Sequence, residues 1–212
     1  MAIQWYPGHM HKARKKIKES MPLIDMVIEV LDARIPYSSE NPLIDDLRGD
    51  RPCITLLNKS DLADPIVTSA WKQYYERERG VKAIAIVAEK KGEAKNLIQK
   101  ISHLAKTMLV ERNLEAKPAR IMIMGIPNVG KSTLLNGLLG RTFAKVGNEP
   151  AVTKIQQSIR LTNGVLLFDT PGILWPKVED EDSGYRLAIS GAIKSTAMES
   201  EDVALYAADY LL

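Results

Sequence analysis

Short runs of apolar residues recur along the chain, separated by longer stretches of mixed polarity. Four of them cover residues 26–31, 52–57, 120–124 and 164–168. Runs of this length, in which nearly every residue is apolar, are typical of strands buried on both faces of a parallel sheet. From about residue 93 to 111, the apolar residues follow helical spacing instead. The pattern therefore predicts a Rossmann-like α/β domain in which helices flank a mostly parallel sheet.

The segment after the third apolar run has the sequence of a phosphate-binding loop. Gly125 to Ser132 match G-x-x-x-x-G-K-[ST] at every fixed position, and apolar residues at helical spacing follow. In this context backbone N–H groups bind phosphates, Lys131 adds a positive charge that assists catalysis, and Ser132 is a Mg²⁺ ligand. A chance glycine-rich turn is the alternative, and the loop alone does not distinguish ATP from GTP. The residues expected to contact the nucleotide here are Asn128, Val129, Gly130, Lys131, Ser132 and Thr133.

Two further segments supply candidates for the Mg²⁺ site and for the parts that move on hydrolysis. The fourth apolar run leads into Asp169, and Gly172 follows three residues later. A carboxylate at the tip of a strand beside a phosphate loop is placed to hold Mg²⁺ through water, and the N–H of Gly172 can meet the γ-phosphate. Thr153, in the polar segment 147–154, is the candidate that completes the Mg²⁺ shell while the γ-phosphate is present. Taken singly, each segment is also compatible with an ordinary turn or loop.

The tetrapeptide Asn58 to Asp61 follows the second apolar run and is suited to reading guanine. In α/β sheets ligands bind beyond the carboxyl ends of the strands. Asp61 can accept hydrogen bonds from the N1–H and 2-amino groups of guanine, a donor pair that adenine lacks. Asn58 can bond the base edge and brace the loops, and the stem of Lys59 can cover the ring. We expect a backbone N–H from Val87 or Ala88 to bind the guanine O6; a helix N-cap is the alternative role for the tetrapeptide.

The base-reading segment precedes the phosphate loop in this chain, whereas it follows the loop in an ordinary G domain. With the segments Trp5 to Met10, Asp32 to Pro36 and Asp169 to Pro176, this order resembles the YlqF family of circularly permuted GTPases. The resemblance covers essentially the whole chain. It implies a P-loop GTPase domain whose five motifs occur in the order G4-G5-G1-G2-G3. G4 is the base-reading tetrapeptide, G5 the O6-binding segment, G1 the phosphate loop, G2 the segment with Thr153, and G3 the segment from Asp169 to Gly172. Such a permutation is tolerated when the original termini lie close together at the surface.

The family resemblance also implies an activity and a partner. The protein would bind GTP and GDP with Mg²⁺ and hydrolyse GTP. It would act in assembly of the large (50S) ribosomal subunit, on the rRNA and ribosomal proteins of the subunit precursor. Hydrolysis would be stimulated by the ribosomal particle.

The residues after the Asp-x-x-Gly motif leave catalysis incomplete. Ile173, Leu174 and Trp175 stand where many GTPases carry the glutamine that orients water. The resemblance suggests His9 in its place, since a histidine can hold or deprotonate water near neutral pH, although the residues alone favour a structural role in an N-terminal turn. Asn128 resembles the asparagine of potassium-stimulated GTPases, so K⁺ is a further candidate cofactor.

Charge is concentrated near the N-terminus. The chain of 212 residues has a net charge of only +3, too mild to indicate RNA binding by itself. A basic helix suits contacts to RNA phosphates, and a solvated helix face is the alternative. The basic residues of this first helix are Lys12, Arg14, Lys15, Lys16 and Lys18.

The organisation expected from the sequence has three parts. These are an N-terminal basic helical segment (1–22), the permuted G domain (23–178) and a C-terminal helical segment (179–212), which resembles the start of a truncated C-terminal domain. No signal peptide or membrane-spanning apolar run is evident, and the only cysteine, Cys53, lies in a predicted strand. We therefore expect a cytoplasmic protein. We also expect a monomer. The rival to a GTPase is a nucleotide-gated scaffold that binds rRNA or the ribosome with negligible turnover, which the missing glutamine would allow.

Overall fold

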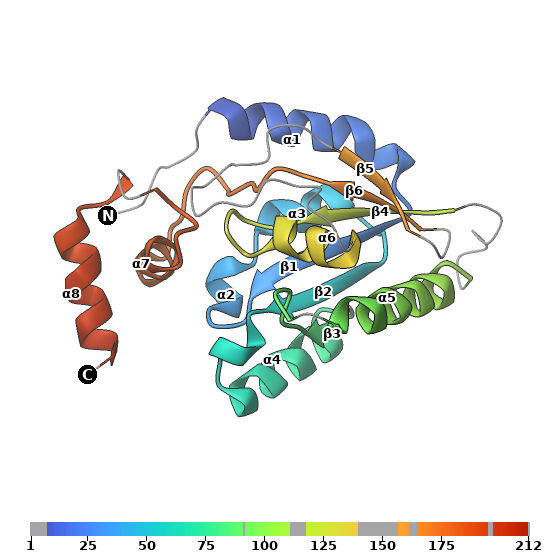
Figure 1. Ribbon diagram of the computed structural model, residues 1–212. Helices are drawn as coiled ribbons and strands as arrows, with labels where there is room; N and C mark the ends of the chain where they lie inside the picture. Colours follow the sequence, from blue (N-terminus) through green and yellow to red (C-terminus); the bar gives the residue numbers. More distant parts are fainter. Residues whose placement is uncertain are drawn as a thin grey trace.

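A computed structural model describes residues 8–90, 92–110, 118–139, 157–161, 165–194 and 197–211. Its centre is a six-stranded sheet in the order β3-β2-β1-β4-β6-β5 (Figure 1). Neighbouring strands are parallel, except that β5 runs antiparallel to β6. The mostly parallel sheet predicted from the apolar runs is thus confirmed, and each of the four runs forms one strand. The strands are β1 (Met26–Asp32), β2 (Cys53–Asn58), β3 (Lys82–Ala85), β4 (Ala119–Met124), β5 (Gln157–Arg160) and β6 (Val165–Asp169).

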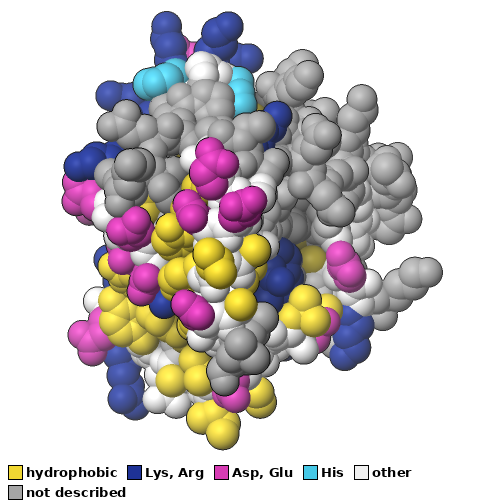
Figure 2. Space-filling view, turned by 90° about the vertical axis from the view of Figure 1, so that its left-hand side faces the viewer, with side chains coloured by type: hydrophobic (Ala, Val, Ile, Leu, Met, Phe, Trp, Pro, Cys, Tyr) yellow, Lys and Arg dark blue, Asp and Glu magenta, His cyan; other side chains and the backbone are white. Residues whose placement is uncertain are grey.

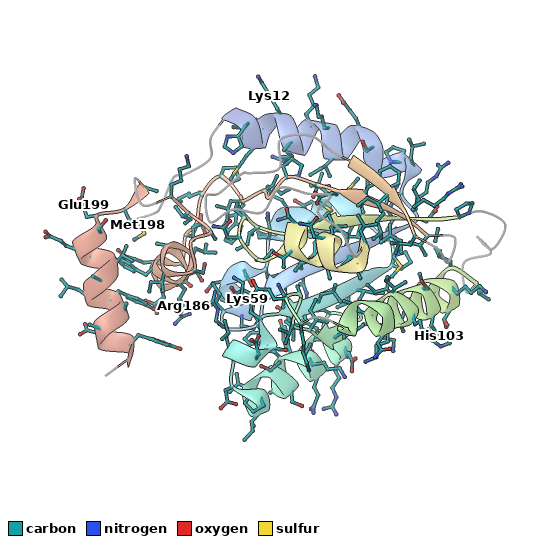
Figure 3. The ribbon with its side chains drawn as sticks, viewed as in Figure 1. Lys12, Lys59, His103, Arg186, Met198 and Glu199 are labelled. Carbon is teal, nitrogen blue, oxygen red and sulfur yellow. The ribbon has the colours of Figure 1, made fainter. Side chains whose placement is uncertain are left out.

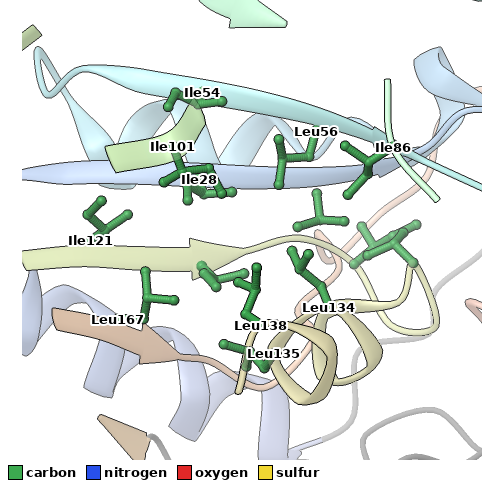
Figure 4. Packing of buried hydrophobic residues seen from close by; sticks show 14 of the residues in the cluster. Ile28, Ile54, Leu56, Ile86, Ile101, Ile121, Leu134, Leu135, Leu138 and Leu167 are labelled. Carbon is green, nitrogen blue, oxygen red and sulfur yellow. The ribbon is translucent and has the colours of Figure 1, made fainter. Parts of the chain in front are cut away.

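Helices cover both faces of the sheet, so the central strands contribute side chains to two cores. In β1, Met26, Ile28 and Val30 face one core, and Val27 and Leu31 face the other. Because neither face meets water, these strands are apolar throughout rather than alternating. Figure 4 shows the first core between the sheet and two helices. Those helices are α5 (Glu93–Val110) and α6 (Lys131–Leu139), and the second core is lined by α1 (Gly8–Ser20), α3 (Pro42–Arg48) and α4 (Pro65–Arg77).

The order of the strands determines where a ligand can bind. From β1 the chain continues to β2 on one side of it, whereas from β4 the next parallel strand, β6, lies on the other side. The crossovers therefore diverge between β1 and β4, and a crevice forms outside the carboxyl ends of the strands at such a point. The carboxyl ends of β1, β2, β4 and β6 all meet at this edge of the sheet, on the side of α7 in Figure 1.

The remaining helices are short or lie near the C-terminal end. The acidic residue Asp180 caps α7, because its side chain accepts a hydrogen bond from the Ser183 N–H at 3.1 Å. The helix begins at Glu181. In the part of the chain described, no helix is long and apolar enough to cross a membrane. The helices concerned are η1 (Met21–Leu23), α2 (Pro36–Ser39), η2 (Ser60–Leu62), α7 (Glu181–Ile189) and α8 (Ser200–Leu211).

Candidate nucleotide-binding site

The phosphate loop lies between β4 and α6 and is held close to β1 and to the base motif. Gly125 has φ +146°, and a Cβ atom there would lie 2.5 Å from the carbonyl oxygen of Val30. Gly130 has φ +97°, and a Cβ atom there would collide with the amide nitrogen of Asn58. A side chain at either position would push the loop away from its neighbours. The two fixed glycines of the sequence pattern thus permit a close approach to both structures.

Lys131 begins α6, and its side chain is enclosed by the phosphate loop. Its exposed fraction is 6%, and Nζ donates hydrogen bonds to the carbonyl oxygens of Gly125 (3.0 Å) and Ile126 (2.6 Å). Burial lowers the pKa of Lys131 to about 8, although the charge of Asp169 acts in the opposite direction. An anion inside the loop would stabilise the charged form of this buried ammonium group, which is the role expected of Lys131 toward phosphates.

Asp169 ends β6 beside the phosphate loop, and its residue is fully buried. Neither carboxylate oxygen has a hydrogen-bond partner among the described residues, and burial raises the pKa of Asp169 to about 6 despite the opposing charge of Lys131. Burying a carboxylate without partners is costly unless a cation binds it. Mg²⁺ prefers oxygen ligands, so Asp169 fits the predicted metal site, and the hydroxyl of Ser132 would be a second ligand.

Asn58 joins the base motif to the two loops beside it. Its residue is 3% exposed, and Nδ2 donates a hydrogen bond to the Val129 carbonyl oxygen at 2.7 Å. Oδ1 accepts one from the backbone N–H of Ala88 at 2.9 Å. The bracing role predicted for Asn58 is therefore present in the structure. Because the N–H of Ala88 is engaged by Asn58, the donor to the guanine O6, expected from Val87 or Ala88, stays a prediction.

Lys59 and Asp61 differ sharply in their surroundings. Nζ of Lys59 donates hydrogen bonds to the carbonyl oxygen of Asn128 (2.9 Å) and to the carboxylate of Asp32 (2.8 Å). Figure 3 shows Lys59 at the carboxyl edge of the sheet. Asp61 lies in η2 and is exposed, and its carboxylate has no hydrogen bond or ion pair to any described residue. It is therefore accessible to a ligand, as a base-reading carboxylate must be.

The segment after Asp169 contacts the phosphate loop through its backbone. A Cβ atom on Gly172 would lie 2.7 Å from the backbone nitrogen of Pro127, and Ile173 N–H donates to the Gly125 carbonyl oxygen at 3.3 Å. Nδ2 of Asn41 in turn donates to the Ile173 carbonyl oxygen at 2.7 Å. Ile173 and Leu174 are 0% and 1% exposed. The residues that replace the water-orienting glutamine are therefore apolar and part of the hydrophobic cores.

Comparisons with known proteins agree with this geometry. A family model described as 50S ribosome-binding GTPase matches residues 120–210. The chain is 49% identical over 215 residues to ribosome biogenesis GTPase A of Priestia megaterium, covering 100% of this chain and 74% of that protein. It is 37% identical to mitochondrial ribosome-associated GTPase 1 of Mus musculus, covering 99% of this chain and 65% of that protein. The crystal structure of GNP-bound YlqF from Thermotoga maritima has a TM-score of 0.70 and 30% identity, covering 94% of this chain and 74% of that one.

This chain belongs to the YlqF family of circularly permuted GTPases. It is therefore a GTPase of the ribosome biogenesis group, and the predicted P-loop domain with permuted motifs is confirmed.

The remaining residues expected to act in this YlqF-family site are Thr153, His9 and Asn128. Thr153 lies outside the described residues. His9 is exposed in the first turn of α1, and no hydrogen bond or ion pair joins it to the described part of the chain. Asn128 lies in the phosphate loop, as predicted, and its Nδ2 donates to the Gly191 carbonyl oxygen at 2.6 Å.

Three residues that contact this site have no role predicted from the sequence. Asp32 belongs to a segment that resembles the family, but no role was assigned to it; its place at the end of a strand next to β2 was a usable signal. Asn41 and Gly191 contact the site from 132 and 63 residues away along the chain, and no local pattern marks them.

Proposed function

We propose that this GTPase acts in assembly of the large ribosomal subunit and that the ribosomal particle stimulates its hydrolysis of GTP. The observation that carries this proposal is the apolar segment after Asp169. Ile173 and Leu174 are buried and cannot polarise water. Efficient hydrolysis therefore requires a group from elsewhere, and a group that arrives only on the particle would couple turnover to assembly.

His9 is the residue proposed to supply this group. It is exposed at the start of α1, where its imidazole is free to meet a partner or to move toward the site. Neutral imidazole can orient or deprotonate a water molecule, and such a general base contributes about 100- to 10,000-fold to a rate. A contact of α1 with the particle would bring His9 into position.

The surface of α1 supports contact with RNA. Met10, Ala13 and Ile17 anchor the helix in the hydrophobic cores, while its lysines are exposed and Arg14 is half-buried. At the top of Figure 2, lysine, arginine and histidine side chains gather in this region. Exposed cations along one helix suit the regularly spaced charges of an RNA backbone. The family description, 50S ribosome-binding GTPase, and the names of the relatives support the ribosome as the source of that RNA.

GTP and GDP with Mg²⁺ are the ligands proposed for the site. The phosphates would lie in the loop from Gly125 to Ser132, and the base would lie against Asn58 to Asp61. Mg²⁺, held by Ser132, Thr153 and Asp169, would neutralise phosphate charge. We also propose that the protein acts as a cytoplasmic monomer.

The test is phosphate release from GTP with and without purified 50S subunits, comparing the wild type with His9→Ala. A matched control is His103→Ala, because His103 is an exposed histidine on α5, well away from Lys59 in Figure 3. The particle should accelerate the wild type and His103→Ala alike. His9→Ala should lose most of that acceleration, by about 100-fold or more.

Two other outcomes would each contradict one part of the proposal. Stimulation that survives in His9→Ala would remove His9 from the mechanism. An unstimulated wild type that still binds the particle in a nucleotide-dependent way would favour the scaffold over the particle-activated enzyme.

Potassium is the second metal ion proposed, because Asn128 resembles the asparagine of potassium-stimulated GTPases. It lies in the phosphate loop, and its side-chain nitrogen is bound to Gly191. That bond uses the amide nitrogen, and the amide oxygen is the atom by which an asparagine side chain binds a cation. Turnover should be faster in potassium than in sodium, and Asn128→Ala should remove the difference. Equal rates of the wild type in both salts would refute this role.

A further inference from the structure

A carboxylate outside the known nucleotide motifs binds the lysine of the base motif. Asp32 ends β1 opposite Asn58 in the sheet register, and its residue is only 1% exposed. Its Oδ2 accepts a hydrogen bond from Lys59 Nζ at 2.8 Å, and the same Nζ donates to the Asn128 carbonyl oxygen at 2.9 Å. One ammonium group therefore connects the end of β1, the base motif and the phosphate loop.

Arg34 fixes the orientation of this carboxylate. Its Nε donates to Oδ1 of Asp32 at 2.9 Å, its Nη2 donates to Oδ2 at 2.7 Å, and its backbone N–H donates to Oδ1 at 3.1 Å. Burial acts to raise the pKa of Asp32, but the hydrogen bonds from Arg34 and Lys59 outweigh it and hold the pKa below the usual value. Asp32 is thus a charged acceptor at neutral pH, and its hydrogen bonds fix its orientation, which an exposed carboxylate would lack.

The connection joins two residues with unusual backbone conformations. Among the described residues, the non-glycine positions with positive φ are Lys59 (+60°) and Asn128 (+59°). Residues other than glycine adopt this left-handed conformation at a cost, and they keep it where surrounding contacts hold them. The hydrogen bond from Lys59 Nζ to the Asn128 carbonyl links them directly. If Lys59 lost its anchor, the base motif and the phosphate loop would each lose one of the contacts that hold this geometry.

We propose that Asp32 is a positioning residue for guanine nucleotides: it holds Lys59 so that the ammonium group binds the phosphate loop while the lysine stem covers the base. The base and phosphate subsites then open and close together, and the nucleotide is retained until both loosen. Asp32 does not touch the nucleotide and acts only through Lys59. This inference rests on the proposed binding of the base at Asn58 to Asp61.

The experiment measures dissociation of a fluorescent GDP analogue from the wild type, Asp32→Asn, Lys59→Met and the double variant. Asparagine keeps the shape of Asp32 but loses the charge, and methionine keeps much of the lysine stem but loses the ammonium group. Asp32→Asn weakens a hydrogen bond between two charged groups, and such bonds contribute more to binding free energy than neutral ones. Release should therefore accelerate by about 10- to 100-fold. In the Lys59→Met background the same change should alter release by less than about 3-fold, because the partner is already absent.

Asp45→Asn is the matched control. Asp45 is also bonded to arginine, at 2.9 Å from Arg48 Nε and in contact with Arg79, but it lies on α3 and not at the carboxyl edge of the sheet. Release of GDP from Asp45→Asn should match the wild type. Asp32→Asn should also keep the wild-type preference for GDP over XDP, since Asp61 remains intact; general damage to the fold would weaken that preference together with retention.

The results separate this inference from the proposed function. If Asp61→Asn fails to shift preference toward xanthine nucleotides, the base site is misplaced. If Asp61→Asn shifts preference but Asp32→Asn releases GDP at the wild-type rate, Asp32 is not a positioning residue. The inference would also be overturned if the double variant released GDP faster than the wild type by the product of the factors for Asp32→Asn and Lys59→Met, because the two residues would then act independently. Should Asp32→Asn not fold, Asp32→Glu, which keeps the charge but displaces it, must show faster release that disappears in the Lys59→Met background.

Discussion

Truncation of Asn58 gives the most direct test of how the base motif supports the nucleotide site. Asn58→Ala removes the donor to the Val129 carbonyl oxygen (2.7 Å) and the acceptor for the Ala88 N–H (2.9 Å). The residue is 3% exposed, so both partners would lose a hydrogen bond in a site with little access to water. A buried polar group left without its partner costs about 1–3 kcal/mol. The two losses together should amount to about 2–6 kcal/mol.

The loss is divided between folding and binding, so both must be measured. Isothermal titration with GDP gives the change in binding free energy, and urea unfolding without nucleotide gives the change in stability. If most of the loss falls on binding, the Kd for GDP rises by about 30-fold to about 20,000-fold. Ser60→Ala is the control in the same motif, because its Oγ makes one hydrogen bond, to the Ile86 carbonyl oxygen at 3.0 Å. It should cost about 1 kcal/mol or less.

A second variant tests the same contact from the other side. A Cβ atom at Gly130 would collide with Asn58 Nδ2. Gly130→Ala should therefore reproduce much of the binding loss, and its effect should shrink in the Asn58→Ala background because the collision partner is gone. The strain of alanine at φ +97° remains in both backgrounds.

A summed loss of binding and folding free energy below about 0.5 kcal/mol in Asn58→Ala would refute the reasoning, since contacts of this kind cannot cost so little.

Two further predictions concern base specificity and pH. Asp61→Asn should shift nucleotide preference from GTP to XTP, because an amide can donate to the xanthine O2 where the carboxylate accepts from the guanine 2-amino group. Competition binding measures the ratio of the two affinities, and an unchanged ratio would exclude Asp61 from base reading. Glu29 is buried, and burial raises its pKa from 4.5 to about 8. Its contribution to the free energy of unfolding is therefore complete below pH 4.5 and is lost as the pH rises through 8. Glu29→Gln keeps an acceptor for the Asn41 N–H without this loss, so its stability relative to the wild type should rise by up to about 4 kcal/mol from pH 5 to pH 8. Urea unfolding at both pH values measures the change, and parallel pH profiles would show that Glu29 does not titrate as inferred.

The predicted strands were correct because both faces of the sheet are covered. In β1, β2 and β4 burial forces apolar residues into continuous runs, which local sequence records directly. The antiparallel edge strand β5 was not predicted. Edge strands are less constrained in composition, so the four residues Gln157–Arg160 left no clear signal.

The sequence by itself determined the chemistry of this GTPase. A phosphate loop, a strand-end aspartate and a base-reading tetrapeptide are each local, since their function depends on a few adjacent residues with fixed backbone geometry. Their rotated order along the chain also identified the family, which the comparisons confirm.

Only the tertiary structure decided how these segments are held together. Asp32 meets Lys59 across 27 residues, Asn128 meets Gly191 across 63, and Asn41 meets Ile173 across 132. Each pair is brought together by the order of strands in the sheet and by the packing of helices on it, not by any pattern within either segment. Local sequence fixes what a side chain can bond, whereas the fold fixes which distant partner comes within hydrogen-bonding distance. The motifs expected to bind the nucleotide could therefore be found in the sequence, whereas the pairing of their residues with distant partners could not.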